Sequence, residues 1–304
     1  MPCKNCKTKP VIQLTNNNVK LCKSCFIRYF EKKVLKTIRK FQLLDKEDNV
    51  AVALSGGKDS LTVLYILNKL ASTKRNLKLT AILIDEGIKG YREHTIKDAK
   101  KFCKENKIPL KIYSFKKEFK YPLDTLIKKI NEKSCTICGV LRRVLLNKKS
   151  RALKVKKLAT GHNLDDEAQS ILMNQFKRNM PLSARLGPKT GVMPNEKFII
   201  RIKPLYLMTE LETATYAHLR NLTTKFNECK YVSDSLRDNV REFLNNFEER
   251  YPGTKNAIIQ SFLEILPLLK EHYAKIGGIK YCKNCEEPCS SEICRTCKLL
   301  EKIR

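Results

Sequence analysis

The chain has no tryptophan, only four histidines among 304 residues, and 31 acidic side chains against 61 basic ones. Histidine can therefore supply few metal ligands, and any metal centre must draw on other side chains. Long hydrophobic runs are also missing, because the longest, residues 257–269, is interrupted by polar residues. It is too short to span a bilayer and predicts an amphipathic helix. Nothing near the start resembles a signal peptide, so we expect a cytoplasmic protein with no membrane association.

The shortage of acidic residues leaves a formal net charge of +30 and a sequence pI of about 9.7. A charge of this size repels itself and attracts polyanions. A lysine-rich surface without a specific partner is the simpler reading. We favour a nucleic-acid partner, because basic residues outnumber acidic ones nearly two to one.

Thirteen cysteines are present, and ten of them form CxxC pairs. Disulfides are not expected in the reducing cytoplasm. Two paired sets each predict a tetrahedral zinc site of four thiolates. The two sets are Cys3, Cys6, Cys22 and Cys25, and Cys282, Cys285, Cys294 and Cys297. A redox dithiol is the alternative for the first set. That segment is too short for a core of its own, so we expect metal binding to supply its folding energy.

Strand-like and helix-like patterns alternate through the middle of the chain, which predicts an α/β fold with a parallel sheet. We expect strands at residues 49–54, 77–84, 109–115 and 156–160, and helices at 28–44, 61–70, 93–106, 123–132, 165–176, 210–222, 236–249 and 254–273. Residues 181–202 contain several Gly and Pro residues and predict a mobile loop near the site.

The segment after the first expected strand reads Ser-Gly-Gly-Lys-Asp-Ser. Gly56 and Gly57 let the backbone approach an anion, and successive N–H groups can then point at phosphate oxygens. Lys58 adds a mobile cation, and Asp59 can orient the loop or bind Mg²⁺. A Gly-Gly turn is often only a turn, but the strand–loop–helix context favours phosphate binding. The Walker A spacing is absent.

Three motifs together carry a family resemblance. Residues 55–60 (SGGKDS), 83–87 (LIDEG) and 161–168 (GHNLDDEA) resemble the motifs of PP-loop ATP pyrophosphatases, and specifically of tRNA 2-thiouridine synthetases of the TtuA/NcsA type. The terminal cysteine sets resemble that family's two zinc sites, and the resemblance covers essentially the whole chain. It implies a PP-loop domain of the adenine nucleotide alpha hydrolase-like, Rossmann-like class, with terminal zinc knuckles and a helical C-terminal part.

The resemblance also implies a domain division: a zinc knuckle at residues 1–27, a catalytic domain at 28–205, a helical region at 206–278 and a second knuckle at 279–304. ATP and Mg²⁺ are the implied substrate and its ion. The implied ATP-binding residues are Ala53, Leu54, Ser55, Gly56, Gly57, Lys58, Asp59, Ser60, Ile84, Asp85, Arg142, Gly161 and Asp166.

Three further cysteines define the implied sulfur chemistry. By resemblance, Cys135, Cys138 and Cys229 bind a [4Fe–4S] cluster and leave one iron open for hydrosulfide. The family's usual proline after the third cysteine is here Lys230. A persulfide on Cys135 or Cys138 is the main alternative, and a structural zinc site is another.

The implied enzyme is a tRNA sulfurtransferase that adenylates the C2 oxygen of uridine and then replaces it with sulfur. Lys58 and Mg²⁺ would neutralise the phosphates. Arg142 would reach the α-phosphate or the developing oxyanion, or else contact solvent or tRNA phosphate. Asp166 would assist proton movement or hold Mg²⁺. If it only capped its helix, Asp165 would be better placed for that.

Other readings stay open. Related PP-loop enzymes make lysidine, GMP or asparagine, or thiolate cytidine, and a non-catalytic zinc-knuckle RNA-binding protein is a further alternative. We favour the wobble uridine over the T-loop uridine as target. Sulfide or a ubiquitin-like carrier would donate sulfur, and the family suggests a homodimer.

Overall fold

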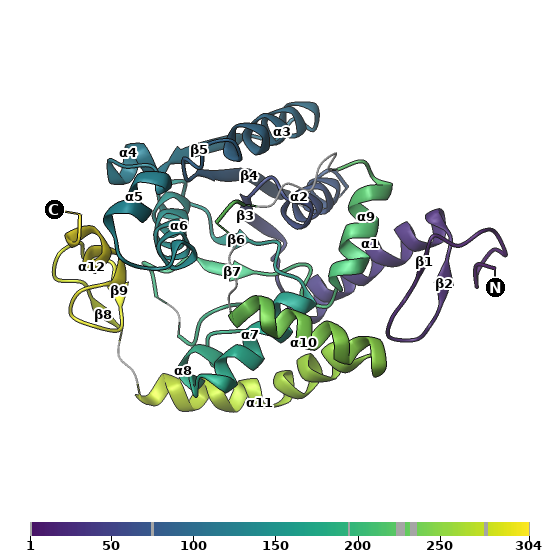
Figure 1. The fold of residues 1–304 in the computed structure, drawn as a ribbon. Helices are drawn as coiled ribbons and strands as arrows, with labels where there is room; N and C mark the ends of the chain where they lie inside the picture. The colour runs from purple at the N-terminus through teal and green to yellow at the C-terminus, as the bar shows by residue number, and fades with distance from the viewer. Residues whose placement is uncertain are drawn as a thin grey trace.

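A computed structural model describes residues 2–73, 76–193, 195–222, 229–231, 236–276 and 279–303. Figure 1 shows a central sheet with helices packed on both faces, and the two ends of the chain on opposite sides of the molecule. Among the described residues, no helix is both long and apolar enough to cross a lipid bilayer.

Five parallel strands form the central sheet in the order β5-β4-β3-β6-β7. Their bounds are β3 Glu47–Leu54, β4 Asn76–Asp85, β5 Leu110–Ser114, β6 Lys157–Ala159 and β7 Ile200–Ile202. The predicted parallel α/β fold is thereby confirmed. The run of apolar residues in β3 places it at the centre, where both faces of a strand are covered.

Alternate residues of the strands pack into two separate cores. Val50, Val52 and Leu54 face the core formed with α2 (Lys58–Ala71), α3 (Arg92–Glu105), α1 (Lys23–Lys40) and α9 (Glu210–Leu219). Ala51 and Ile82 face the opposite core, formed with α4 (Phe115–Phe119), α5 (Leu123–Lys129) and α6 (Ser134–Ala152). A third core joins α7 (Leu164–Phe176), α10 (Leu236–Arg250) and α11 (Thr254–Ile276).

The N-terminal segment contains an antiparallel pair, β1 (Ile12–Gln13) and β2 (Lys20–Leu21), followed directly by α1. The described residues of this segment form no separate hydrophobic core, but the buried ones join the main one. Cys3, Leu14 and Phe26 are buried and belong to the same core as α2 and β3. Because α1 runs across residues 27 and 28, it connects the segment to the sheet without a break.

At the other end, β8 (Lys280–Tyr281), β9 (Pro288–Cys289) and α12 (Arg295–Glu301) form a small unit against α6. Leu299 of α12 is fully buried in the core that α6 shares with the sheet. Arg151 of α6 pairs with Glu287, and Glu132 binds both Arg295 and Lys302. The last cysteine set is thus attached to the helix that begins beside Cys135.

Residues 181–202 are only partly the loop that their composition indicated. They follow the start of a short helix, α8 (Met180–Ser183), and end in β7, which pairs with β6 at the edge of the sheet. A strand of three residues is too short to show a period of two, so its pairing with β6 was not visible in the sequence.

Candidate active site

The SGGKDS loop connects the end of β3 to the start of α2, with Gly57 as the N-cap residue of the helix. Gly56 has φ +86°, and a Cβ there would lie 2.9 Å from the Cβ of Thr95, so only glycine fits. The loop also holds itself in shape. Ser60 Oγ donates to the carbonyl of Gly57 at 3.0 Å and accepts from the backbone N–H of Ser55 at 3.1 Å. A loop of this shape at a helix N-terminus favours an anion.

A cavity of about 670 Å³ opens over this loop, which is large enough for a nucleotide. Its walls come from the loop, from the start of α3, from α9 and from α10 and α11. The lining residues include Gly56, Lys58, Tyr91, Asp98, Glu210 and Asn245. The predicted phosphate loop therefore borders a cavity of suitable size.

Lys58 points into an acidic environment within this cavity. Its Nζ lies 2.9 Å from Glu210 and 3.3 Å from Asp59. Burial opposes the charged ammonium, but the two carboxylates outweigh it and hold the pKa of Lys58 above its usual value. Lys58 is therefore charged near neutral pH and can bind an anion that enters the cavity.

The second motif loop, residues 161–168, lies directly against the phosphate loop. A Cβ on Gly161 would lie 2.8 Å from the backbone nitrogen of Ser60, so glycine is required for this close approach. Asn163 donates to Asp59 at 3.3 Å. The two motifs are thus assembled into one site, although about a hundred residues separate them in the chain.

The capping expectation for this loop was wrong in its choice of carboxylate. Asn163 is the N-cap of α7, and Asp166 completes the capping box with it. Asp165 instead accepts from the backbone N–H of Glu210 at 2.7 Å and pairs with Lys255. The N3 position suits a reciprocal cap, because its side chain reaches back to the N-cap N–H.

Asp59 and Asp166 lie close enough for the charge of Asp166 to act on Asp59. Burial raises the pKa of both carboxyl groups, and in Asp59 the neighbouring Asp166 adds to the effect. Two carboxylates that repel each other beside a phosphate loop are a donor set that fits a divalent cation.

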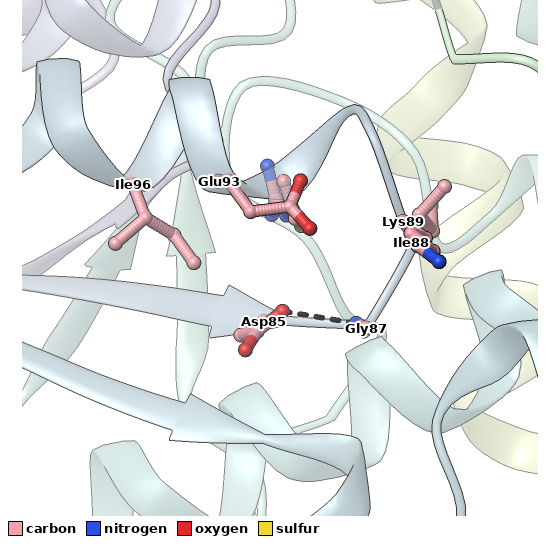
Figure 2. Close-up of a pocket in the computed structure, with 7 residues that line it drawn as sticks. Asp85, Gly87, Ile88, Lys89, Glu93 and Ile96 are labelled. Carbon is pink, nitrogen blue, oxygen red and sulfur yellow. Dashed lines mark hydrogen bonds between the residues drawn. The ribbon is translucent and has the colours of Figure 1, made fainter.

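The third motif follows β4 and contains Asp85, Glu86 and Gly87. Figure 2 shows Asp85 bonded to the backbone N–H of Gly87, at 2.9 Å, in a small pocket of about 180 Å³ beside α3. Gly87 has φ +72°, and a Cβ there would lie 2.6 Å from Pro122. This motif is therefore a tight turn that packs against the start of α5.

A buried charge network that the sequence did not reveal connects these loops. Arg92 pairs with Glu86 and donates to the carbonyl oxygens of Ser55 and Ile84, at 2.6 and 2.5 Å. Glu86 also accepts from Arg142 of α6 at 3.4 Å. Glu86 and Arg92 are 2% and 4% exposed. Glu86 belongs to the LIDEG motif, so the sequence marked it as a candidate site residue. Its partner Arg92 has no such motif and resembles an ordinary residue at the start of a helix.

Cys135 and Cys138 lie in the first turn of α6, three residues apart and therefore on one side of the helix. Cys229, far along the chain, and Cys138 are both partly buried against the core beneath α6, and Cys229 lies near enough to act electrostatically on Cys138. Close by, the carbonyl of Tyr231 accepts from Ser134 Oγ at 3.3 Å and from Cys135 Sγ at 3.7 Å. The structure thus brings the three predicted cysteines to one region, next to Arg142.

Burial raises the pKa of the Cys138 thiol to about 11, against the opposing effect of Arg142. As a free thiol, Cys138 is protonated near neutral pH, and a bound metal centre must displace that proton. All cysteines that the structure describes are free thiols.

The terminal cysteine sets have a different geometry. Within each set of four, the sulfur atoms all lie within 4.8 Å of one another, which fits a single tetrahedral ion. Among the described residues, Cys135, Cys138 and Cys229 do not form a group this tight. Wider spacing is expected where each thiolate binds a different metal atom of a cluster.

Known proteins resemble this chain in both sequence and fold. The model of the PP-loop domain family matches residues 28–248. A tRNA-5-methyluridine(54) 2-sulfurtransferase from Pyrococcus horikoshii is 36% identical, over 98% of this chain and 93% of its own length. The tRNA 2-thiolation protein NcsA from Haloferax volcanii is 32% identical, over 100% and 99%. A solved structure of the U34-tRNA thiolase NcsA from Methanococcus maripaludis with its [4Fe-4S] cluster superposes with a TM-score of 0.86 at 35% identity, covering 100% of this chain and 96% of that one.

Proposed function

This chain belongs to the PP-loop domain family, and from that premise we propose that it is a tRNA sulfurtransferase that activates uridine with ATP before it inserts sulfur. Its relatives, which it matches over nearly their whole length, are named for tRNA 2-thiolation. The excess of basic residues fits a tRNA substrate. Free thiols throughout the described residues fit a reducing cytoplasm.

One observation carries the proposal: Cys138 and Cys229 border the same core and both lie near Arg142, and Arg142 is connected through Glu86 and Arg92 to the phosphate loop. An activating nucleotide and a sulfur-delivering centre would therefore meet over the same edge of the sheet. Ligands of parallel α/β sheets bind at this carboxyl edge.

The first step is adenylation of the C2 oxygen, with pyrophosphate as leaving group. The N–H groups at the start of α2 and the ammonium of Lys58 bind the phosphates. Asp59 and Asp166 would hold the Mg²⁺ that accompanies ATP, and that ion would help to neutralise the phosphates. Arg142, whose side chain is 44% exposed, would stabilise the negative charge that develops on the α-phosphate or the C2 oxygen.

Cys135, Cys138 and Cys229 would hold the [4Fe–4S] cluster. When bound through three thiolates, such a cluster supplies an open iron that can carry the sulfur to be transferred. The chain's own residues orient it: α6 presents the first two thiols, and residues 229–231 present the third. A persulfide on Cys135 or Cys138 is the alternative route, and a single zinc ion would need thiols closer together than these.

We also propose that the terminal cysteine sets hold two Zn²⁺ ions and that the target is the wobble uridine. The superposable thiolase is named for U34, whereas the Pyrococcus relative is named for position 54. Sulfide or a ubiquitin-like carrier supplies the sulfur, and the active form is a homodimer. The zinc knuckles at 1–27 and 279–304 flank a catalytic domain at 28–205 and a helical region at 206–278.

The test uses Cys229→Ala, reconstituted anaerobically, with Cys289→Ala as a matched control at a cysteine outside the proposed centre. We expect Cys229→Ala to lose cluster absorbance and tRNA thiolation, measured by mass spectrometry of nucleosides, but to keep tRNA-dependent pyrophosphate release. Cys289→Ala should keep all three. Normal thiolation by Cys229→Ala would refute the cluster assignment, and wild-type protein without tRNA-dependent pyrophosphate release would refute the enzyme.

A further inference from the structure

Cys229 lies in a tripeptide, residues 229–231, that contacts three other segments of the chain. These are the loop after β4, the first turn of α5 and the first turn of α6. The tripeptide belongs to the connection between α9, which ends at Leu219, and α10, which begins at Leu236. Fixing a point in a connection of this length costs conformational entropy, which specific contacts must offset.

Two of these contacts converge on one carboxylate. Asp124 Oδ1 accepts from the phenolic hydroxyl of Tyr231 at 2.6 Å. Asp124 Oδ2 accepts from Lys230 Nζ at 3.3 Å and from the backbone N–H of Lys89 at 3.0 Å. Hydrogen bonds to an ionised acceptor are the stronger kind. Asp124 therefore ties two of the three residues of the tripeptide to the loop after β4.

The other side of the same tripeptide faces the paired cysteines. The carbonyl oxygen of Tyr231 accepts hydrogen bonds from Cys135 Sγ at 3.7 Å and from Ser134 Oγ at 3.3 Å. Lys230 Nζ also reaches the carbonyl of Lys89 at 3.4 Å. Tyr231 is thus held by its side chain on Asp124 and presents its backbone to the first turn of α6.

We infer that Asp124 is a positioning residue that fastens residues 229–231 and so keeps the Cys229 thiol in the region of the paired cysteines of α6. We call the Asp124 carboxylate with Lys230 and Tyr231 the Asp124 latch. The function of the latch rests on the proposed role of Cys229 in sulfur transfer. Its structural effect, the placement of one thiol, can be measured without any metal.

The first readout is disulfide trapping in the metal-free full-length protein. Diamide oxidises neighbouring thiols, and peptide mass spectrometry then quantifies the bond from Cys229 to Cys135 or Cys138. We expect Asp124→Ala to slow this cross-link about tenfold, the size expected when a hydrogen bond to a charged group is lost. Tyr231→Phe, which keeps the ring and removes one donor, should give a smaller decrease in the same direction.

The second readout is iron per chain after anaerobic reconstitution, together with the rate of iron loss to a chelator. Asp124→Ala should bind less iron and release it faster. The matched control is Glu118→Ala. Glu118 pairs with Lys149 at 2.6 Å, and its side chain is 28% exposed, against 26% for Asp124. The Glu118→Ala variant should cross-link and retain iron as the wild-type protein does.

Two outcomes separate this inference from the proposed function. Cross-linking and iron retention at wild-type levels in both Asp124→Ala and Tyr231→Phe would overturn the latch. If cross-linking depends on Asp124 but Cys229→Ala keeps its full iron content, the latch stands and the role of Cys229 as a cluster ligand fails. Tyr231→Phe keeps the test decisive should Asp124→Ala fold poorly.

Discussion

The guanidinium of Arg92 donates a hydrogen bond of 2.6 Å to the carbonyl oxygen of Ser55, the first residue of the phosphate loop. Arg92 is also paired with buried Glu86, which accepts a second guanidinium from the cysteine-bearing helix α6. The loop proposed to bind ATP and the helix proposed to bind the cluster therefore share one buried carboxylate.

The first prediction concerns this shared carboxylate. Glu86→Gln should lower the free energy of unfolding by about 3 kcal/mol, because it leaves the buried charge of Arg92 without a counterion. Urea denaturation followed by circular dichroism measures the change. Glu93→Gln, at an exposed residue in the first turn of α3, is the control and should lie within about 0.5 kcal/mol of wild type. Equal stability of the two variants would contradict the network.

The second prediction concerns the contact between two motif loops. Gly161→Ala places a methyl group about where the backbone of Ser60 and Asp59 lies, so the phosphate loop must shift. We expect ATP affinity to fall at least about tenfold, since a displacement of this kind disrupts a preorganised site. Isothermal titration calorimetry measures the ATP affinity. Gly253 has φ +97°, so Gly253→Ala strains the backbone and costs stability, but its Cβ meets open space and the folded variant should bind ATP normally. Unchanged affinity in Gly161→Ala would rule out a close nucleotide site.

The third prediction is a pH dependence. Burial alone would raise the pKa of Glu31, but hydrogen bonds from Lys69, Tyr216 and Arg220 outweigh burial and lower it. A carboxyl group whose pKa is depressed by folding contributes stability above its unfolded pKa and loses it as the pH falls through the folded pKa. Glu31→Gln should therefore cost about 1–3 kcal/mol at pH 7 and progressively less below about pH 4.5.

Urea titrations at several pH values check this third prediction. Glu105→Gln, at an exposed carboxylate 4.0 Å from Lys101, serves as the control and should show a small and flat difference. A Glu31→Gln difference that does not shrink toward acid pH would show that the ion pairs of Glu31 are not its source.

The fourth prediction concerns metal content. Cys25→Ser and Cys297→Ser should each reduce bound zinc from two ions per chain to one, because each removes a ligand from a different four-cysteine group. Cys25→Ser should also lower the melting temperature, since its group shares buried residues with the main core. Inductively coupled plasma mass spectrometry measures the number of zinc ions per chain. Cys289→Ser should keep both ions, and two ions in either of the other variants would disprove the assignment.

Local patterns were enough to predict much of the fold and of the site. Apolar runs predicted β3 and β4, and the SGGKDS spacing predicted the phosphate loop, because both signals lie within a few neighbouring residues. The sequence also placed Gly161 at the site through its motif. In the structure, the reason for a glycine there is the backbone of Ser60.

Other features depend on contacts between distant residues and left no local trace. Asp124 contacts Tyr231 across more than a hundred residues, and nothing around Asp124 distinguishes it from an ordinary helix-start carboxylate. Arg92 is similar. From the sequence, Asp165 was expected to be the better helix cap. The carboxylate of Asp166 makes the reciprocal bond instead, to the backbone N–H of Asn163, and this bond depends on side-chain geometry that the sequence does not show.

The attachment of the last cysteine set to α6 has a consequence for protein synthesis. A growing chain exposes Cys135 and Cys138 long before the ribosome has made Cys229 or the residues around Leu299 that support α6. Since translation proceeds from the N-terminus, a half-finished polypeptide has the first pair of thiols but lacks the third and the support beneath them. If these cysteines hold the proposed cluster, all three ligands become available only after residue 229 has been translated.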